Sequence, residues 1–152
     1  MEDYHRRRDF NKTGEPKGAV EAGSSGLVFV VQRHDASNLH FDLRLEREGV
    51  LKSWAVPKGI PLELGVRRLA VQTEDHPLDY ADFEGTIPQG EYGVGEVKIW
   101  DKGFYELIKW VDKEIIFTPH GDKMKKTYVL IKMKSSVRFP GEDNWLLFMK
   151  KT

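Results

Sequence analysis

Short runs of apolar residues, either consecutive or alternating with polar ones, recur along the chain from residue 27 onwards. They are rich in Val, Ile, Phe, Trp and Tyr and have the length and composition of β-strands. The runs lie at 27–32, 39–46, 50–56, 68–73, 95–100, 104–110, 114–119, 127–133 and 144–149. No long segment keeps a 3.6-residue apolar period, so the pattern predicts strands rather than long helices.

Turn-forming residues separate the runs. They are Glu48-Gly49, Pro57-Lys58-Gly59, Pro88-Gln89-Gly90, Asp101-Lys102-Gly103, His120-Gly121-Asp122 and Pro140-Gly141. The pattern predicts an all-β, mainly antiparallel fold, with one compact single-domain β-barrel of about eight strands at 27–152, because closure removes exposed strand edges. A β-sandwich is the competing shape. Residues 1–26, with several Gly, Ser and Pro, are expected to form an irregular N-terminal arm.

Composition excludes several classes of protein. Of the 152 residues, 39% are hydrophobic and 32% are charged, which argues against a membrane protein and against wholesale disorder. The first ten residues are charged and lack the apolar segment of a signal peptide, so we expect a cytoplasmic protein. Cysteine is absent, and any metal ligands must therefore be His or carboxylate side chains.

Charge is balanced over the whole chain but not along it. Lys and Arg number 24, and so do Asp and Glu, so the net charge gives no argument for a nucleic-acid partner. Two basic stretches, 5–12 and 123–134, are candidates for contacts to phosphate groups. A solvated surface is the alternative for both.

The run at 39–46 carries an unusual polar face. His40, Asp42 and Arg44 alternate along this predicted strand at intervals of about 7 Å. The opposite face, which we expect to pack into the core, carries Leu39, Phe41, Leu43 and Leu45. His34, near the end of the preceding run, can supply a third ligand, so two imidazoles and a carboxylate would form a site for Zn²⁺, Fe²⁺ or Mn²⁺. An ordinary polar strand surface is the alternative.

Other charged groups point to an anion beside this site. The permanent cation Arg44 would repel a bound metal unless an anion lay between them, and a phosphate suits that position. His76 follows a predicted strand and precedes Pro77, where we expect a functional loop residue or a surface histidine. Lys58 and Arg68 flank a loop that contains Gly and Pro, and we expect them either to face one pocket or to be solvated.

Four segments carry a resemblance to a known family. They are QRHDASNLHFDLRLE (32–46), LKSWAVPKG (51–59), RRLAVQTEDHPLDYADFEGTIPQGEYGVGEVKIWDKG (67–103) and NWLLFMK (144–150). Together with RRDFNKTGEP (7–16), they resemble the 3′-phosphoesterase module of bacterial DNA ligase D, and in particular its free-standing archaeal members. The resemblance is nearly gapless from Gln32 to Gly103 and weakens between residues 104 and 134.

The resemblance implies a compact β-barrel with a Mn²⁺-dependent site, for which Zn²⁺ and Co²⁺ are alternative ions. It implies that the protein heals DNA 3′ ends bearing a terminal ribonucleotide, by a phosphodiesterase step and then a phosphomonoesterase step that leave a 3′-OH. By position, the implied metal ligands are His34, His40 and Asp42, the phosphate-binding residues are Arg44 and His76, the further active-site residues are Lys58, Arg68, Tyr80 and Gln32, and the arm residues are Arg8, Asp9 and Glu15.

The expected substrate is a DNA primer-template end, with no membrane partner. No ligase or polymerase domain is recognisable in these residues, and partnership in trans with a separate DNA ligase or polymerase is a hypothesis. One rival interpretation is an Fe²⁺ oxygenase with a facial triad of His40, Asp42 and His76. The other rival is a non-catalytic nucleic-acid-binding barrel whose candidate stacking residues are Phe104, Tyr105, Trp110 and Tyr128.

Overall fold

The computed structural model describes residues 27–87 and 95–151. In chain order the elements are β1 (Val28–Asp35), β2 (Leu39–Arg47), β3 (Val50–Val56), β4 (Arg68–Pro77), the short 3-10 helix η3 (Leu78–Asp82), β5 (Gly85–Ile87), β6 (Gly95–Val111), β7 (Glu114–His120), β8 (Tyr128–Lys132) and β9 (Asn144–Met149). Within the described ranges, no helix has both the length and the apolar character needed to cross a membrane.

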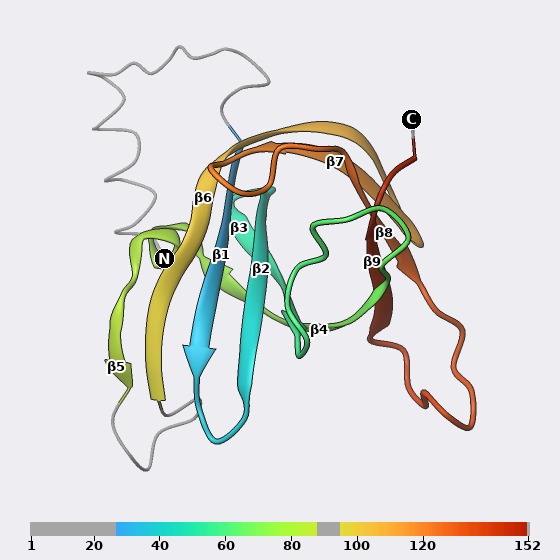
Figure 1. Cartoon of the computed structure of the whole chain (residues 1–152), viewed down its shortest axis with the longest axis horizontal. Coiled ribbons are helices and arrows are strands. Elements are labelled where there is room, and N and C mark those ends of the chain that lie inside the picture. Colours follow the sequence, from blue (N-terminus) through green and yellow to red (C-terminus); the bar gives the residue numbers. More distant parts are fainter. Residues whose placement is uncertain (1–26, 88–94, 152) are drawn as a thin grey trace.

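Eight strands of the described chain close into an antiparallel barrel. Their order is β1-β2-β3-β4-β9-β8-β7-β6, and β6 pairs back onto β1 to complete the ring. β6 and β7 arch together over one end, while β4 curves between β9 and β3 (Figure 1). β5 adds to β6 outside the ring. The predicted all-β barrel is confirmed, and the competing sandwich does not form.

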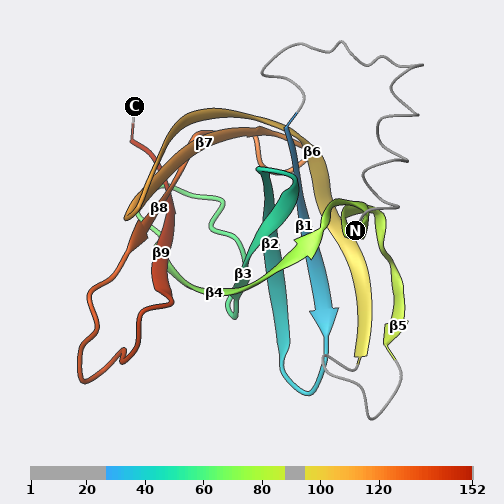
Figure 2. The same ribbon diagram turned by 180° about the vertical axis from the view of Figure 1, so that it is seen from behind.

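Two apolar clusters lie on opposite sides of the β1-β2-β3 sheet. Members of the main core cluster include Phe29, Leu43, Leu45, Trp54, Tyr105, Phe117 and Leu147. The smaller cluster consists of Val30, Leu51, Leu78 and Ala81, and its last two members come from η3. In the view from behind, the end of β4 passes in front of β1 and β2 (Figure 2), and η3, which follows it, packs against Val30 of β1 and Leu51 of β3. The outer face of the barrel is therefore covered by a second layer at this point.

This second layer changes the expected environment of strand β2. Leu43 and Leu45 are fully buried in the core, as predicted for the apolar face. On the opposite face Asp42 and Arg44, at 8% and 4% exposure, are also buried instead of facing solvent. Leu39 departs from the prediction, since it is 43% exposed at the end of the strand, beside the β1-β2 turn.

The turn predicted at residues 101–103 is wrong, because one strand, β6, runs through it from Gly95 to Val111. The β1-β6 register shifts beside this point, so Val31 pairs with Asp101 while Gln32 pairs with Ile99. Such a bulge bends a strand without ending it. Gly103 allows the backbone of β6 to approach the carbonyl oxygen of His120 closely, because a Cβ at this position would lie 2.2 Å from that oxygen.

Asp101 fixes the turn that follows β7. Its buried carboxylate accepts hydrogen bonds from the backbone amides of Asp122, Lys123 and Met124 at 2.8, 3.0 and 2.7 Å. Gly121 allows this approach, since a Cβ there would lie 2.5 Å from a carboxylate oxygen of Asp101. Asp101, predicted as part of a local turn, therefore organises a turn 21 residues further along the chain.

We predict that Asp101→Ala lowers the free energy of unfolding by about 3 kcal/mol, because it leaves buried amide groups without an acceptor. Asp101→Asn keeps one acceptor oxygen and is expected to cost less. Urea denaturation followed by tryptophan fluorescence measures both changes. The exposed Asp112→Ala serves as the control and should change the stability by less than about 0.5 kcal/mol. Equal effects at positions 101 and 112 would contradict this role of Asp101.

Candidate metal and phosphate site

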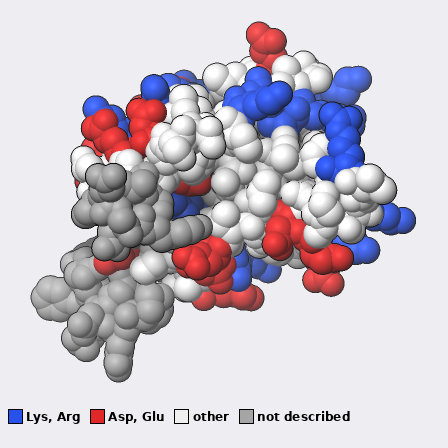
Figure 3. Space-filling model, turned by 90° about the horizontal axis from the view of Figure 1, so that it is seen from below, with Lys and Arg blue, Asp and Glu red and all other residues white. Residues whose placement is uncertain are grey.

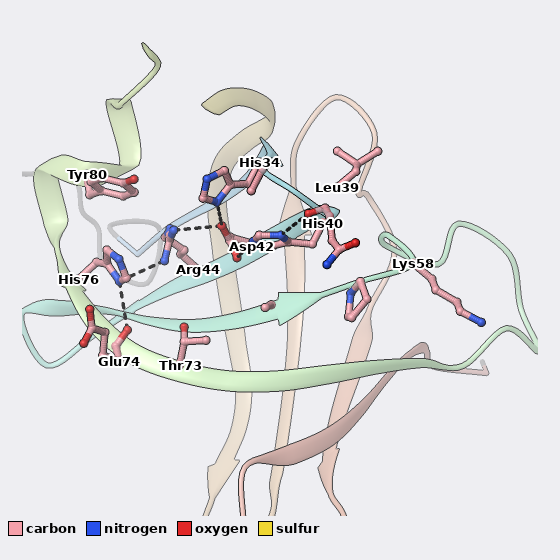
Figure 4. Close-up of a pocket in the computed structure, with 14 residues that line it drawn as sticks. His34, Leu39, His40, Asp42, Arg44, Lys58, Thr73, Glu74, His76 and Tyr80 are labelled. Carbon is pink, nitrogen blue, oxygen red and sulfur yellow. Dashed lines mark hydrogen bonds and ion pairs between the residues drawn. The ribbon is translucent and has the colours of Figure 1, made fainter. Parts of the chain in front are cut away.

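A cavity of about 810 Å³ opens on the outer face of the barrel, where β2, β3, β4 and η3 meet. The predicted residues that line it are His34, His40, Asp42, Arg44, Lys58, His76 and Tyr80. Figure 4 shows His34, Asp42, Arg44 and His76 as a connected row of side chains. These groups therefore lie together at one location, as the sequence-based hypothesis of a single site requires.

Strand pairing brings the three predicted metal ligands together. His34 lies directly opposite His40 across the β1-β2 ladder, and Gln32 lies opposite Asp42. Candidate ligand atoms of His34, His40 and Asp42 all lie within 4.8 Å of one another. Two imidazoles and one carboxylate at this spacing fit Mn²⁺, Fe²⁺ or Zn²⁺, with coordination positions left for water or substrate.

The carboxylate of Asp42 is the centre of the cluster. One oxygen lies 3.3 Å from His40 Nε2, and the other lies 3.7 Å from His34 Nδ1 and 3.4 Å from Arg44 Nη2. Burial alone would raise the pKa of Asp42, but its hydrogen bond with His40 and the charge of Arg44 bring that pKa below its usual value. Asp42 is therefore ionised near neutral pH and available to a cation.

His40 responds to the same contact in the opposite sense. Its hydrogen bond with Asp42 raises the pKa of His40 above its usual value, although burial acts against this rise. The other ring nitrogen, Nδ1, lies 3.2 Å from the carbonyl oxygen of Asn38 in the β1-β2 turn. This contact orients the ring with Nε2 towards Asp42, as is common for histidine ligands of metals.

Arg44 is held in one orientation by neighbours from two adjacent strands. Its Nε donates to Gln32 Oε1 at 2.7 Å, and its Nη1 donates to Ser53 Oγ at 2.8 Å. The guanidinium also lies over the ring of Tyr80, 4.9 Å from the ring centre. Burial lowers the pKa of Arg44, yet a guanidinium stays charged at any physiological pH. A fixed and poorly hydrated cation thus stands beside the three candidate ligands.

His76 lies on the far side of Arg44 from Asp42. Its Nδ1 is 3.1 Å from Arg44 Nη1 and 3.0 Å from the carbonyl oxygen of Glu74, and its ring lies against Tyr80 with centres 4.9 Å apart. Burial, and next the charge of Arg44, lower the pKa of His76, so the ring is neutral near pH 7. Burial also raises the pKa of Tyr80, which keeps its hydroxyl protonated.

The prediction that His76 lies in a loop is wrong, because β4 continues to Pro77. The β3-β4 register shifts along this segment, with Ser53 opposite Thr73 but Leu51 opposite His76. The one extra residue on β4 forms a bulge, and bulges redirect side chains beside functional sites. His76 reaches Arg44 through this local irregularity.

Gln32 links the site to the second layer. While its oxygen accepts from Arg44, its Nε2 donates to the carbonyl oxygens of Tyr80 and Phe83 at 2.8 and 3.1 Å. A fully buried amide therefore ties β1, β2 and η3 together beneath the cavity. This position makes Gln32 a residue that orients Arg44.

The remaining predicted site residues lie further out. Lys58 lines the cavity rim, and in Figure 4 its side chain points away from the cluster. Arg68 is not among the lining residues, since its guanidinium donates to the carbonyl oxygen of Lys58. It therefore supports the loop after β3, and of the two expectations for Arg68 it is the position in the pocket that does not occur. Arg8, Asp9 and Glu15 lie outside the described residues.

Sequence reasoning missed Ser53, which bonds Arg44 from β3. The signal was available, because the predicted turn at Glu48-Gly49 makes a hairpin, and counting back from the Arg47-Val50 pair places Arg44 opposite Ser53. A serine directly across the ladder from a buried arginine satisfies one of its donors.

The geometry disfavours the oxygenase interpretation. It requires His40, Asp42 and His76 to converge on one ion, whereas His76 contacts Arg44 and the backbone of Glu74. Among the described residues, the group that can share an ion contains His34 in place of His76. The facial triad expected from the HxD…H pattern is therefore not assembled.

The stacking residues proposed for a simple nucleic-acid-binding barrel are mostly engaged in packing. Tyr105 and Tyr128 are buried, and their hydroxyls donate to the carbonyl oxygens of Glu46 and Pro61. Trp110 packs against the core and carries the guanidinium of Arg47 on its ring. Phe104, at 37% exposure, is stacked on His120. These rings do not form a common exposed platform.

Comparison with known proteins identifies a family model whose matched range includes this site. The family model described as the DNA ligase D 3′-phosphoesterase domain matches residues 32–132, which include every cluster residue named above. The multifunctional non-homologous end joining protein LigD of Pseudomonas aeruginosa is 50% identical over 99% of this chain and 18% of its own length. The corresponding DNA repair protein of Mycobacterium tuberculosis H37Rv is 47% identical over 94% of this chain and 19% of its own.

A third relative, the LigD protein of Mycolicibacterium smegmatis, is 45% identical over 97% of this chain and 20% of its own length. The chain thus spans about a fifth of the length of these curated relatives. The family model covers well over half of the chain and includes the three candidate ligands. The chain belongs to the DNA ligase D 3′-phosphoesterase domain family.

Proposed function

We propose that this chain is a Mn²⁺-dependent phosphoesterase that heals DNA 3′ ends in non-homologous end joining. Its substrate is a primer-template end that carries a terminal ribonucleotide or a 3′-phosphate. A phosphodiesterase step releases the terminal nucleoside, and a phosphomonoesterase step then leaves a 3′-OH for a polymerase or ligase. Membership in the family supports the reaction class, and a separate ligase or polymerase acting in trans is part of the proposal.

The observation that carries the proposal is the order of charges along the cavity. A carboxylate and two imidazoles lie within 4.8 Å of one another, and a buried guanidinium lies 3.4 Å from the same carboxylate. A divalent cation at the three ligands and the guanidinium of Arg44 would both attract an anion placed between them. A phosphate ester supplies the right charge and has oxygen atoms for both partners.

A bound Mn²⁺ would supply Lewis-acid polarisation of a phosphoryl oxygen and a more acidic water. In the first step a water oxygen forms a bond to phosphorus, the bond from phosphorus to the nucleoside 5′-oxygen breaks, and the leaving oxygen takes a proton. In the second step water again attacks phosphorus, and the bond to the DNA 3′-oxygen breaks to give inorganic phosphate and a 3′-OH.

The chain's own residues orient and neutralise the phosphate. Arg44, fixed by Gln32 and Ser53, offsets the negative charge that develops on the phosphoryl oxygens. The neutral ring of His76 has one N–H, which we assign to a hydrogen bond with the phosphate. Lys58 adds positive charge at the rim, and Tyr80 packs against both Arg44 and His76. A ribonucleotide requirement means that the 2′-OH is contacted, because that group separates RNA from DNA.

The activity test uses a labelled primer-template with one 3′-terminal ribonucleotide, incubated with Mn²⁺, Mg²⁺, Zn²⁺, Co²⁺ or a chelator. We expect conversion to 3′-phosphate and then 3′-OH ends with Mn²⁺ and none with chelator. His34→Ala, His40→Ala and Asp42→Ala should each reduce the rate at least ~100-fold, since loss of a ligand should exceed the effect of losing a supporting residue.

The matched control is Lys113→Gln, an exposed change in the β6-β7 turn that should keep the full rate. A parallel reaction with Fe²⁺ and 2-oxoglutarate tests the oxygenase alternative. Failure of the wild-type chain to process the primer with any of these ions would reject the proposed activity, and turnover of 2-oxoglutarate would favour the rival.

Arg44→Lys tests the phosphate-binding assignment separately from metal binding. Lysine keeps the charge but not the planar donor set that bonds Gln32 and Ser53. We expect kcat/KM to fall by roughly 100-fold while Mn²⁺ affinity, measured by the electron paramagnetic resonance of free Mn²⁺, changes little. A rate near that of the wild type would show that Arg44 does not stabilise the transition state.

Metal affinity should depend on pH because a proton and a metal ion compete for His40. The pKa of His40 is raised, so the ring holds its proton to a higher pH than usual, while metal binding requires the neutral ring. Below that pKa, the Kd for Mn²⁺ should rise about tenfold for each unit by which the pH falls. Titrations of Mn²⁺ between about pH 5.5 and 7.5 measure this slope. His76→Gln should show the same slope, and a flat profile would contradict the ligand assignment.

A further inference from the structure

A second cavity, of about 480 Å³, lies outside the site described above. It is lined by Leu62, Lys123, Lys125, Lys126, Tyr128 and Met149, which we call the lysine groove. The three lysines are exposed, whereas Tyr128 is buried and its hydroxyl donates to the carbonyl oxygen of Pro61. The groove therefore has an apolar floor and a positively charged rim.

The loop between β3 and β4 connects this groove to the candidate active site. Pro57 and Lys58 line the site cavity, and Leu62 lines the lysine groove. The segment from Lys58 to Leu62 spans at most about 14 Å between its terminal Cα atoms even when fully extended. Along one strand of B-DNA this distance corresponds to about four nucleotides.

A set of side-chain contacts provides a second connection. Lys123 Nζ lies 5.1 Å from the centre of the Trp100 ring and donates to the Trp100 carbonyl oxygen at 2.9 Å. The ring of Trp100 packs edge-on against Phe41, with ring centres 5.7 Å apart. Phe41 lies between the candidate ligands His40 and Asp42 in the chain. The lysine groove is thus linked to the site through β2, with Phe41 on the core face of this strand and the candidate ligands on its outer face.

The lysines of the groove have no acidic partner among the ion pairs of the described residues, although Lys123 also contacts Trp100. Lys52, Lys98, Lys102 and Lys109 each form an ion pair with an acidic side chain. Among the described residues, no such pair involves Lys123, Lys125 or Lys126, and one acid, Asp122, shares their turn. Lys and Arg side chains also gather along one edge of the face seen from below (Figure 3).

We propose that the lysine groove binds the sugar-phosphate backbone of DNA upstream of the 3′ end that occupies the site. This inference rests on the proposed function and adds the path of the substrate strand. Lysines without carboxylate partners attract phosphates, and the apolar floor accommodates the sugars between them. The contact is independent of base sequence and supplies affinity for long substrates, without a part in the bond-breaking steps.

The test compares the variant Lys123→Gln/Lys125→Gln/Lys126→Gln with a control of equal charge change, Lys113→Gln/Lys132→Gln/Lys134→Gln. The control lysines lie at the start of β7 and the end of β8, away from the turn that carries the groove lysines. Among the described residues, no ion pair with an acid involves them. On a 12-nucleotide primer in a duplex, the groove variant should raise KM about tenfold with kcat within about twofold of the wild type. The slope of log KM against the logarithm of the salt concentration should be smaller by about two to three than for the wild type, roughly one for each lost phosphate contact.

A nucleoside 3′-monophosphate is too short to reach the groove, so the groove variant should hydrolyse it like the wild type. The same KM and salt slope for the groove variant and the control on the long substrate would overturn the inference. Lys125→Gln/Lys126→Gln, which leaves the Lys123-Trp100 contact intact, should show the same direction of change and excludes a folding defect. Fluorescence anisotropy in the presence of a chelator measures DNA binding without turnover and therefore tests the groove by itself. Failure of the wild-type chain to hydrolyse either substrate would refute the proposed function and leave this binding test unaffected.

Discussion

The buried pair of Asp42 and Arg44 is the interaction on which the rest of the site depends. Removing two opposite charges from water is costly unless each keeps polar partners. Asp42 has His34 and His40, and Arg44 has Gln32, Ser53 and His76. These partners come from four strands that surround the pair. The barrel face and its covering layer supply every group that makes the buried pair tolerable, and the same groups form the candidate site.

Much of the fold follows from local sequence patterns. All nine predicted runs lie in strands, and two of them, 95–100 and 104–110, belong to the single strand β6, because alternation and turn residues report the barrel ladder directly. The failure at Asp101 and Gly103 has a physical cause. A carboxylate that caps a distant turn and a glycine that permits a close approach are the same residue types that form local turns. Only the three-dimensional contacts distinguish the two uses.

The candidate site was predictable to the extent that it depends on strand periodicity. His40 and Asp42 share a face because side chains alternate, and His34 lies opposite His40 because the intervening turn is short. The burial of Arg44 was not predictable in this way, since its cover comes from β4 and η3, which follow it by more than 20 residues. The position of His76 depends on a bulge that no periodicity indicates. Gln32 and Tyr80 entered only through the family resemblance.

The central claim is that a divalent cation and a phosphate occupy adjacent positions between the three ligands and Arg44. A crystal structure with Mn²⁺ and phosphate, with anomalous scattering at the manganese edge, tests it most directly. The account predicts one manganese peak bonded to His34, His40 and Asp42, with the phosphate between that ion and the side chains of Arg44 and His76. An ion bound through His76 instead of His34, or a phosphate out of reach of Arg44, would contradict it.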